Sequence, residues 1–539
     1  MIARTEASAE TSSSSSVIFS TVKLPSGRRA RNRLVKVAMY EHLASFGGGP
    51  PNSYHLDLYS QWAKHSWGMI ITGNVIITDD HLTLGRDLIL PPSLTIDSES
   101  TALPFKKLAD AIHGIDFDTR EGQKDKANET LAIMQLSHGG RQSANIVGGR
   151  FPFQKPLAPS STRLAPSDSS LISRALNGAL FQIPRAMSQN EINEVIDRFV
   201  EGAIFAYKCG FDGVQLHAAH GYLLAQFLSP KSNKRDDIYS VQNALDIIQT
   251  IVSNIRERTS STFIICIKLN AAEYTSAADA NNSLSNLEQR AMDHILAMAT
   301  WGLLDIIEIS GGDYEKPDFV MAEDVPRSRR QAFFSSFSHK ALQALESLKD
   351  TISTPLPLIL LTGGLKSLDL LDTVLDSRHA HLLGIGRASV TCPNLPCVVQ
   401  ERSKNPRQWD GELFGREPNL KTTTILTYPP FSWCLGYMPD VKLIGAGAEV
   451  AWHVLGMRQI ATSSTDIVNV NCGGLTSVLG MWFWIPYACR GANNSKKRLG
   501  LSRTFNISNN WKVMFLSYKM FFLLAVFPIA MYLILCIIF

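Results

Sequence analysis

The chain has 539 residues, of which 45% are hydrophobic and 19% are charged, and its formal net charge is +4. This length suits one large domain with additions or several smaller domains, and the apolar fraction is large enough for a buried core. So small a net charge, scattered along the chain, argues against a nucleic-acid-binding protein. The eight cysteines form no C-x-x-C pair and no zinc spacing, which argues against a disulfide framework and indicates a reducing compartment.

We expect residues 1–20 to be a flexible, serine-rich tail. The opening MIARTEASAETSSSSS contains Glu6 and Glu10 and no apolar run, unlike a secretory signal. The two acidic residues also disfavour the alternative of an organelle transit peptide, because such peptides avoid acids.

Eight short apolar runs, each rich in Val, Ile or Leu, lie between residues 30 and 390. They are Leu34–Met39, Met69–Thr72, Leu131–Leu136, Val214–His217, Phe263–Leu269, Asp305–Ile309, Leu358–Leu361 and Leu382–Ile385. Such continuous runs are typical of strands that are buried on both faces, as in a parallel sheet. Amphipathic segments separate most of them. The pattern predicts the α/β class, with a (β/α)₈ TIM barrel over residues 21–400.

One of the intervening helices has clear end signals. Ser188 and Glu191 have the spacing of a capping box, an amphipathic run follows them, and Gly210 is placed as its end. In contrast, residues 116–129 are charged and aperiodic, so we expect a solvated loop there. Residues 145–185 are rich in Pro, Ser and Gly, and we expect them to form a long excursion over the barrel.

The C-terminal part differs in character from the barrel. Residues 401–511 are predicted to be an extension with one helical pattern, AGAEVAWHVLGMRQIA, and residues 512–539 a membrane anchor that ends in a single hydrophobic helix. The uncharged run Met520–Phe539 is roughly 30 Å long as a helix, about one hydrocarbon thickness. Lysines and arginines precede it, so we expect the catalytic domain on the cytosolic side. The alternatives are a cytoplasmic protein and a decayed or mistranslated extension from about residue 470.

The segment FDGVQLHAAHGY, residues 211–222, concentrates polar side chains where a predicted strand ends. His217, His220 and Tyr222 follow the apolar positions directly, and the exits of parallel barrel strands are where active sites lie. Two histidines three residues apart also suit a metal ion. No carboxylate or third histidine has a matching spacing, so we predict no metal site and disfavour a metal-dependent hydrolase.

Further motifs occur at the ends of other predicted strands. They are VAMYEH (37–42), TGN (72–74), QLSHGGRQS (135–143), IKLN (267–270), ISGGDYE (309–315), LTGGLKS (361–367) and GIGRAS (384–389). In this order, and together with HAAHGY, they resemble the Old Yellow Enzyme family, specifically its NADH:flavin oxidoreductase branch. The resemblance covers roughly residues 20–400 and implies FMN as cofactor and NAD(P)H as co-substrate.

The resemblance also implies roles for individual residues. Gln135 would hydrogen-bond the pyrimidine edge of the flavin, since an amide can donate and accept at once. Lys268 would place a cation beside flavin N1. His217 and His220 would grip a substrate carbonyl oxygen, and Tyr222 would be the proton donor.

The remaining residues of the predicted flavin site come from four strand ends. Gly363, Gly364, Gly386 and Arg387 would hold the FMN phosphate, because barrels often bind phosphate after strands seven and eight. Met39, Tyr40 and Gly73 would line the flavin. Tyr40 departs from the family, which usually has threonine or cysteine there, and Ser240-Val241 replaces two usual glycines.

These residues predict an FMN-dependent oxidoreductase. NAD(P)H would reduce FMN, which would then reduce the C=C bond of an enone or enal, a small molecule with an α,β-unsaturated carbonyl group. Because Tyr40 departs from the family, an alternative function stays open, that of a related flavoenzyme that oxidises a biosynthetic intermediate or NAD(P)H. The unusual C-terminus leaves open a catalytically decayed, membrane-anchored flavin binder.

Overall fold

The computed structural model describes most of the chain up to residue 484. The described ranges are 15–94, 99–115, 130–164, 177–178, 180–270, 283–311, 327–409, 411–415, 417–418, 420 and 442–484. The predicted tail (1–20) lies partly, and the predicted loop (116–129) and membrane anchor (512–539) entirely, outside these ranges. Within them, no helix has the length and apolarity needed to span a bilayer. The anchor therefore stays a prediction.

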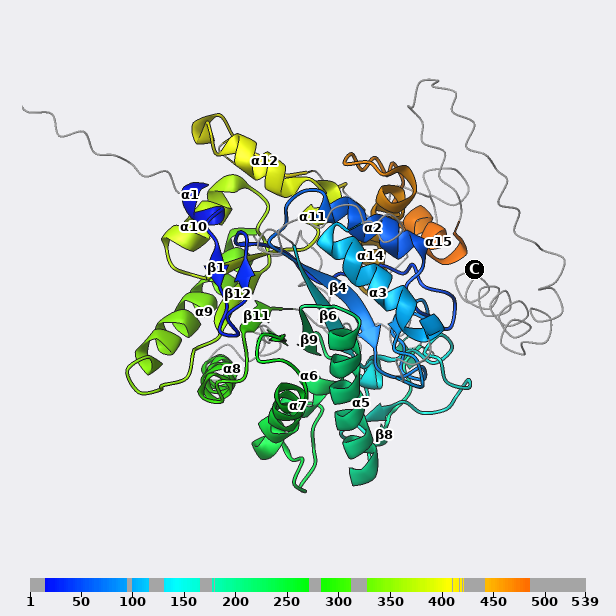
Figure 1. Cartoon of the computed structure of the whole chain (residues 1–539). Coiled ribbons are helices and arrows are strands. Elements are labelled where there is room, and N and C mark those ends of the chain that lie inside the picture. The colour runs from blue at the N-terminus through cyan, green and yellow to red at the C-terminus, as the bar shows by residue number, and fades with distance from the viewer. Residues whose placement is uncertain are drawn as a thin grey trace, which may run out of the picture. The chain divides into compact units, whose positions relative to one another are not determined.

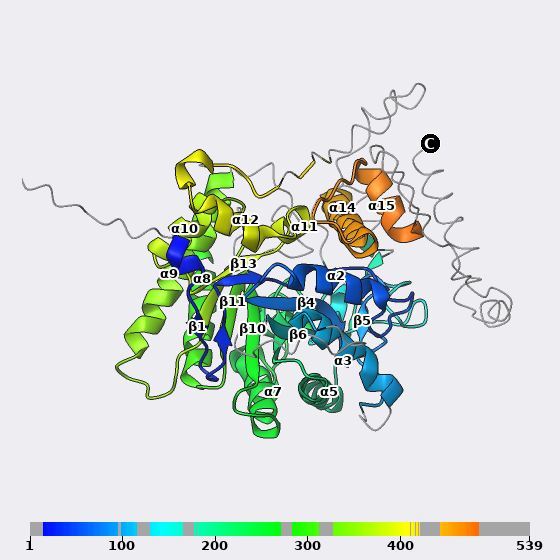
Figure 2. The same cartoon turned by 45° about the horizontal axis from the view of Figure 1, so that its top comes forward.

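Eight parallel strands form a closed ring at the centre of the molecule (Figures 1 and 2). In chain order they are β3 (Leu34–Lys36), β4 (Met69–Ile76), β6 (Leu131–Ser137), β9 (Gly213–Ala218), β10 (Ile264–Asn270), β11 (Ile306–Ser310), β12 (Leu358–Thr362) and β13 (Leu382–Ile385). The ring closes because β3 pairs with both β13 and β4. The predicted parallel barrel is confirmed.

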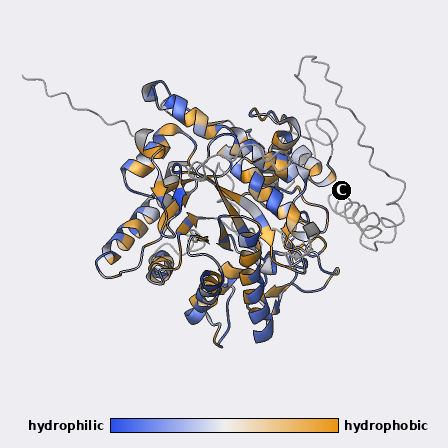
Figure 3. Ribbon diagram, in the orientation of Figure 1, coloured by the Kyte–Doolittle hydropathy of each residue, from blue (hydrophilic) through white to orange (hydrophobic). Residues whose placement is uncertain are grey.

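Helices on the outside connect consecutive strands. They are α2 (Ser53–Ala63), α3 (Glu99–His113), α5 (Gln189–Lys208), α7 (Ala244–Arg258), α8 (Ser283–Thr300), α9 (Arg327–Leu348) and α10 (Leu368–Asp376). Short additions to this frame are α1 (Ser15–Ile18), β5 (Leu88–Ile89), β7 (Leu157–Ala158), β8 (Arg185–Ala186), α6 (Leu223–Leu228), α11 (Ala388–Thr391) and α12 (Leu395–Arg402). In Figure 3 the outer helices α5 and α7 carry both hydrophilic and hydrophobic colours, as two-sided helices should.

The predicted start of α5 is present. The Ser188 side chain accepts a hydrogen bond from the Glu191 amide at 3.3 Å, and the Glu191 carboxylate accepts one from the Ser188 amide at 2.8 Å. These bonds satisfy two amides that the first helical turn leaves without partners. Gly210, placed after the helix, has φ +91°, a left-handed conformation that suits glycine.

The inner face of the barrel changes from apolar to polar along four of its strands. In the lower part, Val35, Ile133, Cys266, Ile306 and Leu360 belong to one buried apolar cluster. Two residues further along four of these strands, the inner positions are polar: Gln135, Lys268, Glu308 and Thr362. Because side chains alternate between faces, these residues point into the mouth at the carboxyl ends of the strands.

A short hairpin closes the opposite end of the barrel. Strands β1 (Val22–Lys23) and β2 (Arg29–Ala30) pair antiparallel, and Val22, Leu24 and Ala30 pack on the interior apolar cluster. The Ser26 amide donates to the buried Asp305 carboxylate at 2.6 Å, which fixes the turn below β11.

The extension forms helices α14 (Lys442–Ser463) and α15 (Gly474–Phe483). Helix α14 contains the predicted helical pattern and packs against α2 and α15 (Figure 2). Arg458 donates to the carbonyls of Gly480 and Met481 at 2.9 and 2.7 Å, which ties the end of α15 to α14. The described part of the extension is thus packed on the outside of the barrel beside α2.

Candidate active site

The two predicted histidines and the predicted tyrosine converge where β9 ends. The ring of His217 lies 5.1 Å from that of His220 and 4.5 Å from that of Tyr222, measured between centroids. His220 and Gly221 both have positive φ, +56° and +73°. This left-handed turn reverses the chain directly after the strand and returns the His220 ring to His217.

Both imidazoles are kept neutral by their surroundings. Burial, followed by the positive charge of Lys268, lowers the pKa of His220 well below its usual value. For His217, burial is again the main cause of a lowered pKa, with contributions from His220 and Lys268. Nδ1 of His217 is buried and has no hydrogen-bond partner in the described part of the chain. Such an atom is available to a bound molecule.

The Tyr222 phenol is held by the last residue of the TGN motif, to whose side chain the sequence analysis assigned no role. Asn74 on β4 donates a hydrogen bond from Nδ2 to the Tyr222 oxygen at 3.1 Å. This bond uses a lone pair of the phenol oxygen and not its hydrogen. Tyr222 also immediately precedes α6, whose first amide, of Leu223, donates to the His138 carbonyl at 3.0 Å. The backbone after Tyr222 is therefore fixed to the end of β6.

A chain of polar side chains crosses the barrel mouth. Gln135 Nε2 donates to Gln215 Oε1 at 2.7 Å, and Gln215 Nε2 donates to Glu308 Oε2 at 2.8 Å. Lys268 Nζ lies 2.9 Å from Glu308 Oε1, and all four side chains are buried. The structure therefore brings Gln135 and Lys268 together, as predicted, through two residues that the sequence analysis missed. A charged residue inside the apolar run DIIEIS was the available signal for Glu308.

Two glycine turns follow the last barrel strands. Gly363 and Gly364, after β12, have φ of +133° and +74°, where a side chain would strain the backbone. Gly386 follows β13, and a Cβ there would meet only Val37, at 3.7 Å. Consecutive backbone amides in such turns can form an anion-binding concavity.

Arg387 is already engaged by the extension. Its Nη1 lies 2.9 Å from Glu449 on α14 and 3.6 Å from Glu417, which also pairs with Lys366 at 2.8 Å. Arg387, which is predicted to bind the phosphate, thus has two carboxylates beside it. Nothing in the motifs of the barrel could have indicated these partners, because they lie outside the region of the resemblance.

The segment after β3 meets the middle of β4 at Gly73. A Cβ on Gly73 would come within 1.9 Å of the Glu41 carboxylate and 2.3 Å of the Met39 carbonyl. The Gly73 amide donates to Glu41 at 2.9 Å, and Glu41 also accepts from the Tyr59 phenol. Gly73 therefore permits a close approach between two segments of the protein itself.

Tyr40, half-buried, lies at the same mouth. The centroid of its ring is 5.7 Å from that of His42, and the two rings are tilted by 60°. Met39 packs against the outer core. Strand β3 ends at Lys36, so both residues lie beyond it, whereas the predicted run extended to Met39.

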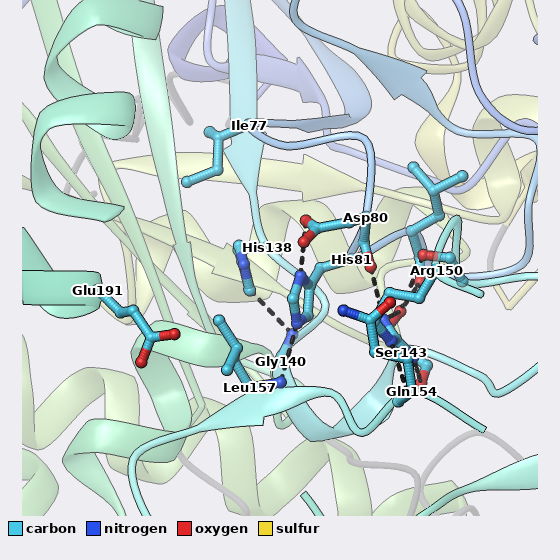
Figure 4. Close-up of polar contacts among 12 residues, drawn as sticks. Ile77, Asp80, His81, His138, Gly140, Ser143, Arg150, Gln154, Leu157 and Glu191 are labelled. Atoms are coloured by element: carbon cyan, nitrogen blue, oxygen red, sulfur yellow. Dashed lines mark hydrogen bonds and ion pairs between the residues drawn. The ribbon is translucent and has the colours of Figure 1, made fainter. Parts of the chain in front are cut away.

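A second polar cluster supports the loops beside the mouth (Figure 4). His81 Nδ1 contacts Asp80 at 2.8 Å, and His81 Nε2 accepts from the Leu157 amide at 2.9 Å. His81 also stacks on His138 at 4.3 Å, and Arg150 donates to the carbonyls of Asp80 and Ser143. The cluster borders a cavity of about 530 Å³. It anchors the predicted excursion to β4 and β6, so we regard it as structural support for the mouth.

The donors at the mouth fit a flavin mononucleotide. Gln135 supplies an amide for the pyrimidine edge, Lys268 a cation, and the glycine turns backbone amides for a phosphate. His217, whose Nδ1 is buried without a partner among the described residues, is the register partner of Lys268. The chain thus offers donors of the right chemistry to each part of the cofactor.

Comparison with curated relatives agrees with this assignment. Over 380 residues the chain is 32% identical to the NADH-dependent flavin oxidoreductase iliE of Neonectria sp. (strain DH2), covering 70% of this chain and 46% of that protein. It thus spans about half the length of that relative. It is 30% identical to the NADH-dependent flavin oxidoreductase iccE of Talaromyces variabilis, covering 82% of this chain and 97% of that protein.

A solved structure supports the fold. The Old Yellow Enzyme homologue from Zymomonas mobilis matches with a TM-score of 0.52 and 20% identity, covering 71% of this chain and 92% of that one. The sequence profile of the NADH:flavin oxidoreductase / NADH oxidase family matches residues 18–405. These matches confirm the predicted resemblance, the flavin and NAD(P)H, and an NAD(P)H:flavin oxidoreductase activity. The chain therefore belongs to the NADH:flavin oxidoreductase / NADH oxidase family.

Proposed function

We propose that the protein is an FMN-dependent ene-reductase that uses NAD(P)H to saturate the C=C bond of an enone or enal. The observation that carries this proposal is the convergence of two neutral imidazoles and one phenol at the end of β9. They adjoin the strand that carries Lys268, since Lys268 is the register partner of His217. A carbonyl-binding pair and a proton donor thus lie beside the predicted flavin site.

FMN, when bound, supplies the hydride that it has accepted from NAD(P)H. The chain contributes the binding groups: Gln135 at the pyrimidine edge, Lys268 beside N1, and the glycine turns with Arg387 at the phosphate. Met39, Tyr40 and Gly73 border the ring at the ends of β3 and β4. Each of these groups projects from a barrel strand or the turn after it, which is a rigid support for a bound cofactor.

His217 and His220 would activate the substrate. A neutral imidazole has one N–H, so each ring can donate one hydrogen bond to the same carbonyl oxygen. For His220 this requires that Nε2, 3.1 Å from the Ser310 hydroxyl, accepts from that hydroxyl and that Nδ1 carries the proton. The two donors withdraw electron density from the oxygen and make the β-carbon more electrophilic. Burial strengthens these bonds because no water competes with them.

Tyr222 would complete the reduction. The β-carbon receives the hydride and the α-carbon receives the phenolic proton, so the C=C bond becomes a C–C bond with one hydrogen added to each carbon. The Asn74 amide, which already donates to the phenol oxygen, would stabilise the negative charge left there. Solvent then reprotonates Tyr222.

Replacement of Tyr222 by phenylalanine tests this assignment. We expect the wild-type protein to be yellow and to reduce 2-cyclohexenone with NAD(P)H. In Tyr222→Phe, the half-reaction with the enone should slow by about 100-fold or more, which is typical for loss of a general acid. Reduction of the flavin by NAD(P)H should be unchanged, as measured by stopped-flow absorbance. An unchanged rate with the enone would refute the role of Tyr222.

A second candidate is a related flavoenzyme that oxidises NAD(P)H with oxygen or oxidises a biosynthetic intermediate. Tyr40 favours it, because a phenol in place of the usual small residue changes the site beside the flavin. Anaerobic product analysis separates the two: a saturated ketone formed in proportion to NAD(P)H supports ene-reduction. Consumption of NAD(P)H only when oxygen is admitted supports the second candidate.

A further inference from the structure

We propose that Glu308 sets the reduction potential of the flavin by neutralising Lys268, and that it orients the amide of Gln135 through Gln215. This inference rests on the proposed FMN site, but it concerns a residue to which neither the motifs nor the resemblance gives a role. Glu308 acts through its neighbours, so it is a positioning residue and not a catalytic one.

The position of Glu308 in the barrel requires a function of this kind. It is the central residue of β11, its side chain is completely buried, and its register partners are Lys268 on β10 and Leu360 on β12. A carboxylate without exposure in a strand of Ile residues is costly unless its charge is compensated. The groups around the Glu308 carboxylate supply this compensation.

Both carboxylate oxygens are occupied. Oε1 lies 2.9 Å from Lys268 Nζ and accepts a hydrogen bond from the Thr362 hydroxyl at 2.8 Å. Oε2 accepts from Gln215 Nε2 at 2.8 Å. Three strands, β9, β10 and β12, are therefore tied to β11 at one level of the barrel.

The carboxylate also fixes the direction of the amide chain. An ionised carboxylate only accepts hydrogen bonds, so Gln215 must turn its NH₂ group towards Glu308. Its carbonyl oxygen then faces Gln135 and accepts from Nε2 of that residue at 2.7 Å. Gln135 is left with its carbonyl oxygen and one N–H for a ligand. The carbonyl oxygen is the acceptor that a flavin N3–H requires.

The charge of Glu308 limits the effect of Lys268. A lone buried cation beside N1 would stabilise the electron-rich reduced flavin strongly, because the effective dielectric constant at a buried site is low. With a carboxylate 2.9 Å away, the two charges largely cancel. The ion pair thus keeps the reduction potential of the flavin below the value that Lys268 alone would give.

The test is a redox titration of the FMN-loaded full chain at pH 7 against reference dyes. In Glu308→Gln, we expect the ratio of affinities for reduced and oxidised FMN to rise about tenfold, which raises the two-electron potential by about 30 mV. Lys268→Met should shift the potential in the opposite direction. The matched control Thr362→Val removes a neutral hydrogen bond to the same oxygen and should leave the potential within a third of that shift.

A conservative variant covers the case in which Glu308→Gln fails to fold. Glu308→Asp keeps the charge but shortens the side chain, so the potential should stay near the wild-type value while FMN dissociates more readily, as measured by flavin fluorescence. A potential that is unchanged or lowered in Glu308→Gln would overturn the inference. If Glu308→Gln does not fold, a shifted potential in Glu308→Asp would overturn the inference.

The outcomes separate this inference from the proposed function. If the potential shifts as expected but no enone is reduced, the ene-reductase proposal fails and the role of Glu308 stands. If enones are reduced and the potential does not respond, only the role of Glu308 fails. A wild-type protein that cannot bind FMN would refute both.

Discussion

His217 and His220 illustrate how burial decides the chemistry of a residue. An exposed histidine titrates near pH 6.5, but these two rings are buried and face the Lys268 cation. Both effects disfavour the imidazolium. The pair therefore offers the same two neutral rings over the whole physiological range, and in the proposed reaction a substrate carbonyl would meet hydrogen bonds and not a full positive charge.

A pH profile tests this property. Because the pKa of each histidine is lowered well below 6.5, the neutral form persists as pH falls through 7 and 6. The rate of the enone half-reaction should therefore show no ionisation between pH 5.5 and 7.5, measured by stopped-flow with pre-reduced enzyme. An inflection near pH 6.5 that disappears in His217→Asn would contradict the assignment.

Lys36 is a buried cation outside the barrel wall. Its ammonium lies 4.1 Å from the centre of the Trp62 ring and 5.2 Å from that of Tyr59, both on α2. Burial, opposed by the charge of Glu41, lowers its pKa to about 8. The folded protein thus releases a proton from Lys36 at a lower pH than the unfolded chain does.

This difference makes stability depend on pH. Between pH 8 and 10.5 the unfolded state binds more protons at Lys36 than the folded state, so this residue makes the free energy of unfolding rise with pH. Its contribution should reach about 3 kcal/mol across that window. Urea unfolding at pH 7.5 and 10.5 should show this gain in the wild type and lose it in Lys36→Met. An equal gain in both proteins would contradict the lowered pKa.

At the scale of elements, the extension meets the barrel at the predicted phosphate site. Helix α14 places Glu449 on Arg387, and Glu417 joins Arg387 to Lys366. Any phosphate that binds Arg387 must share this cation with Glu449. The affinity for FMN should therefore depend on a residue outside the region that matches the family.

Comparison of FMN with riboflavin tests this dependence. In Glu449→Gln, we expect FMN to bind about three to ten times more tightly, because a competing charge on a half-buried arginine has been removed. Riboflavin has no phosphate, so its affinity should not change. Glu412→Gln, which alters an exposed carboxylate 3.5 Å from Arg402, is the matched control. Equal changes for both flavins would rule out competition at the phosphate.

The elements also show where sequence reasoning ends. The eight strands could be predicted because each is a continuous apolar run, and the site residues because they end such runs. Gln215 and Glu308 were missed although they point inward by the same alternation, since their roles depend on partners from other strands. The side chain of Asn74 was missed because β4 has a register shift between Ile71 and Asn74, which a period of two does not predict. The contact between Glu449 and Arg387 could not be predicted, because it joins segments 62 residues apart with no shared motif.

At the scale of the whole molecule, the described part of the extension belongs to the core. The described residues, up to 484, form one compact unit. Ala451, Val454, Met457 and Ile460 on α14 are fully buried in the same apolar cluster as the outer helices. The family match ends at residue 405, but the packed body does not.

Truncation distinguishes the end of the family match from the end of the packed body. A chain ending at residue 487 should keep its flavin and its melting temperature. A chain ending at residue 405 exposes the apolar surface that α14 covers, including α2, and should lose on the order of several kcal/mol of stability. Differential scanning calorimetry measures the melting temperatures of both truncated chains. Equal melting temperatures would show that α14 contributes nothing to the core.

The hairpin of β1 and β2 has a consequence for the order of events in turnover. Because it closes the floor of the barrel, we expect NAD(P)H and the proposed enone substrate to reach the flavin site from the same side, at the carboxyl ends of the strands. If both occupy one position there, one must depart before the other binds, and the expected result is ping-pong kinetics with parallel double-reciprocal lines. High concentrations of either reactant should then inhibit by occupying the wrong form of the enzyme.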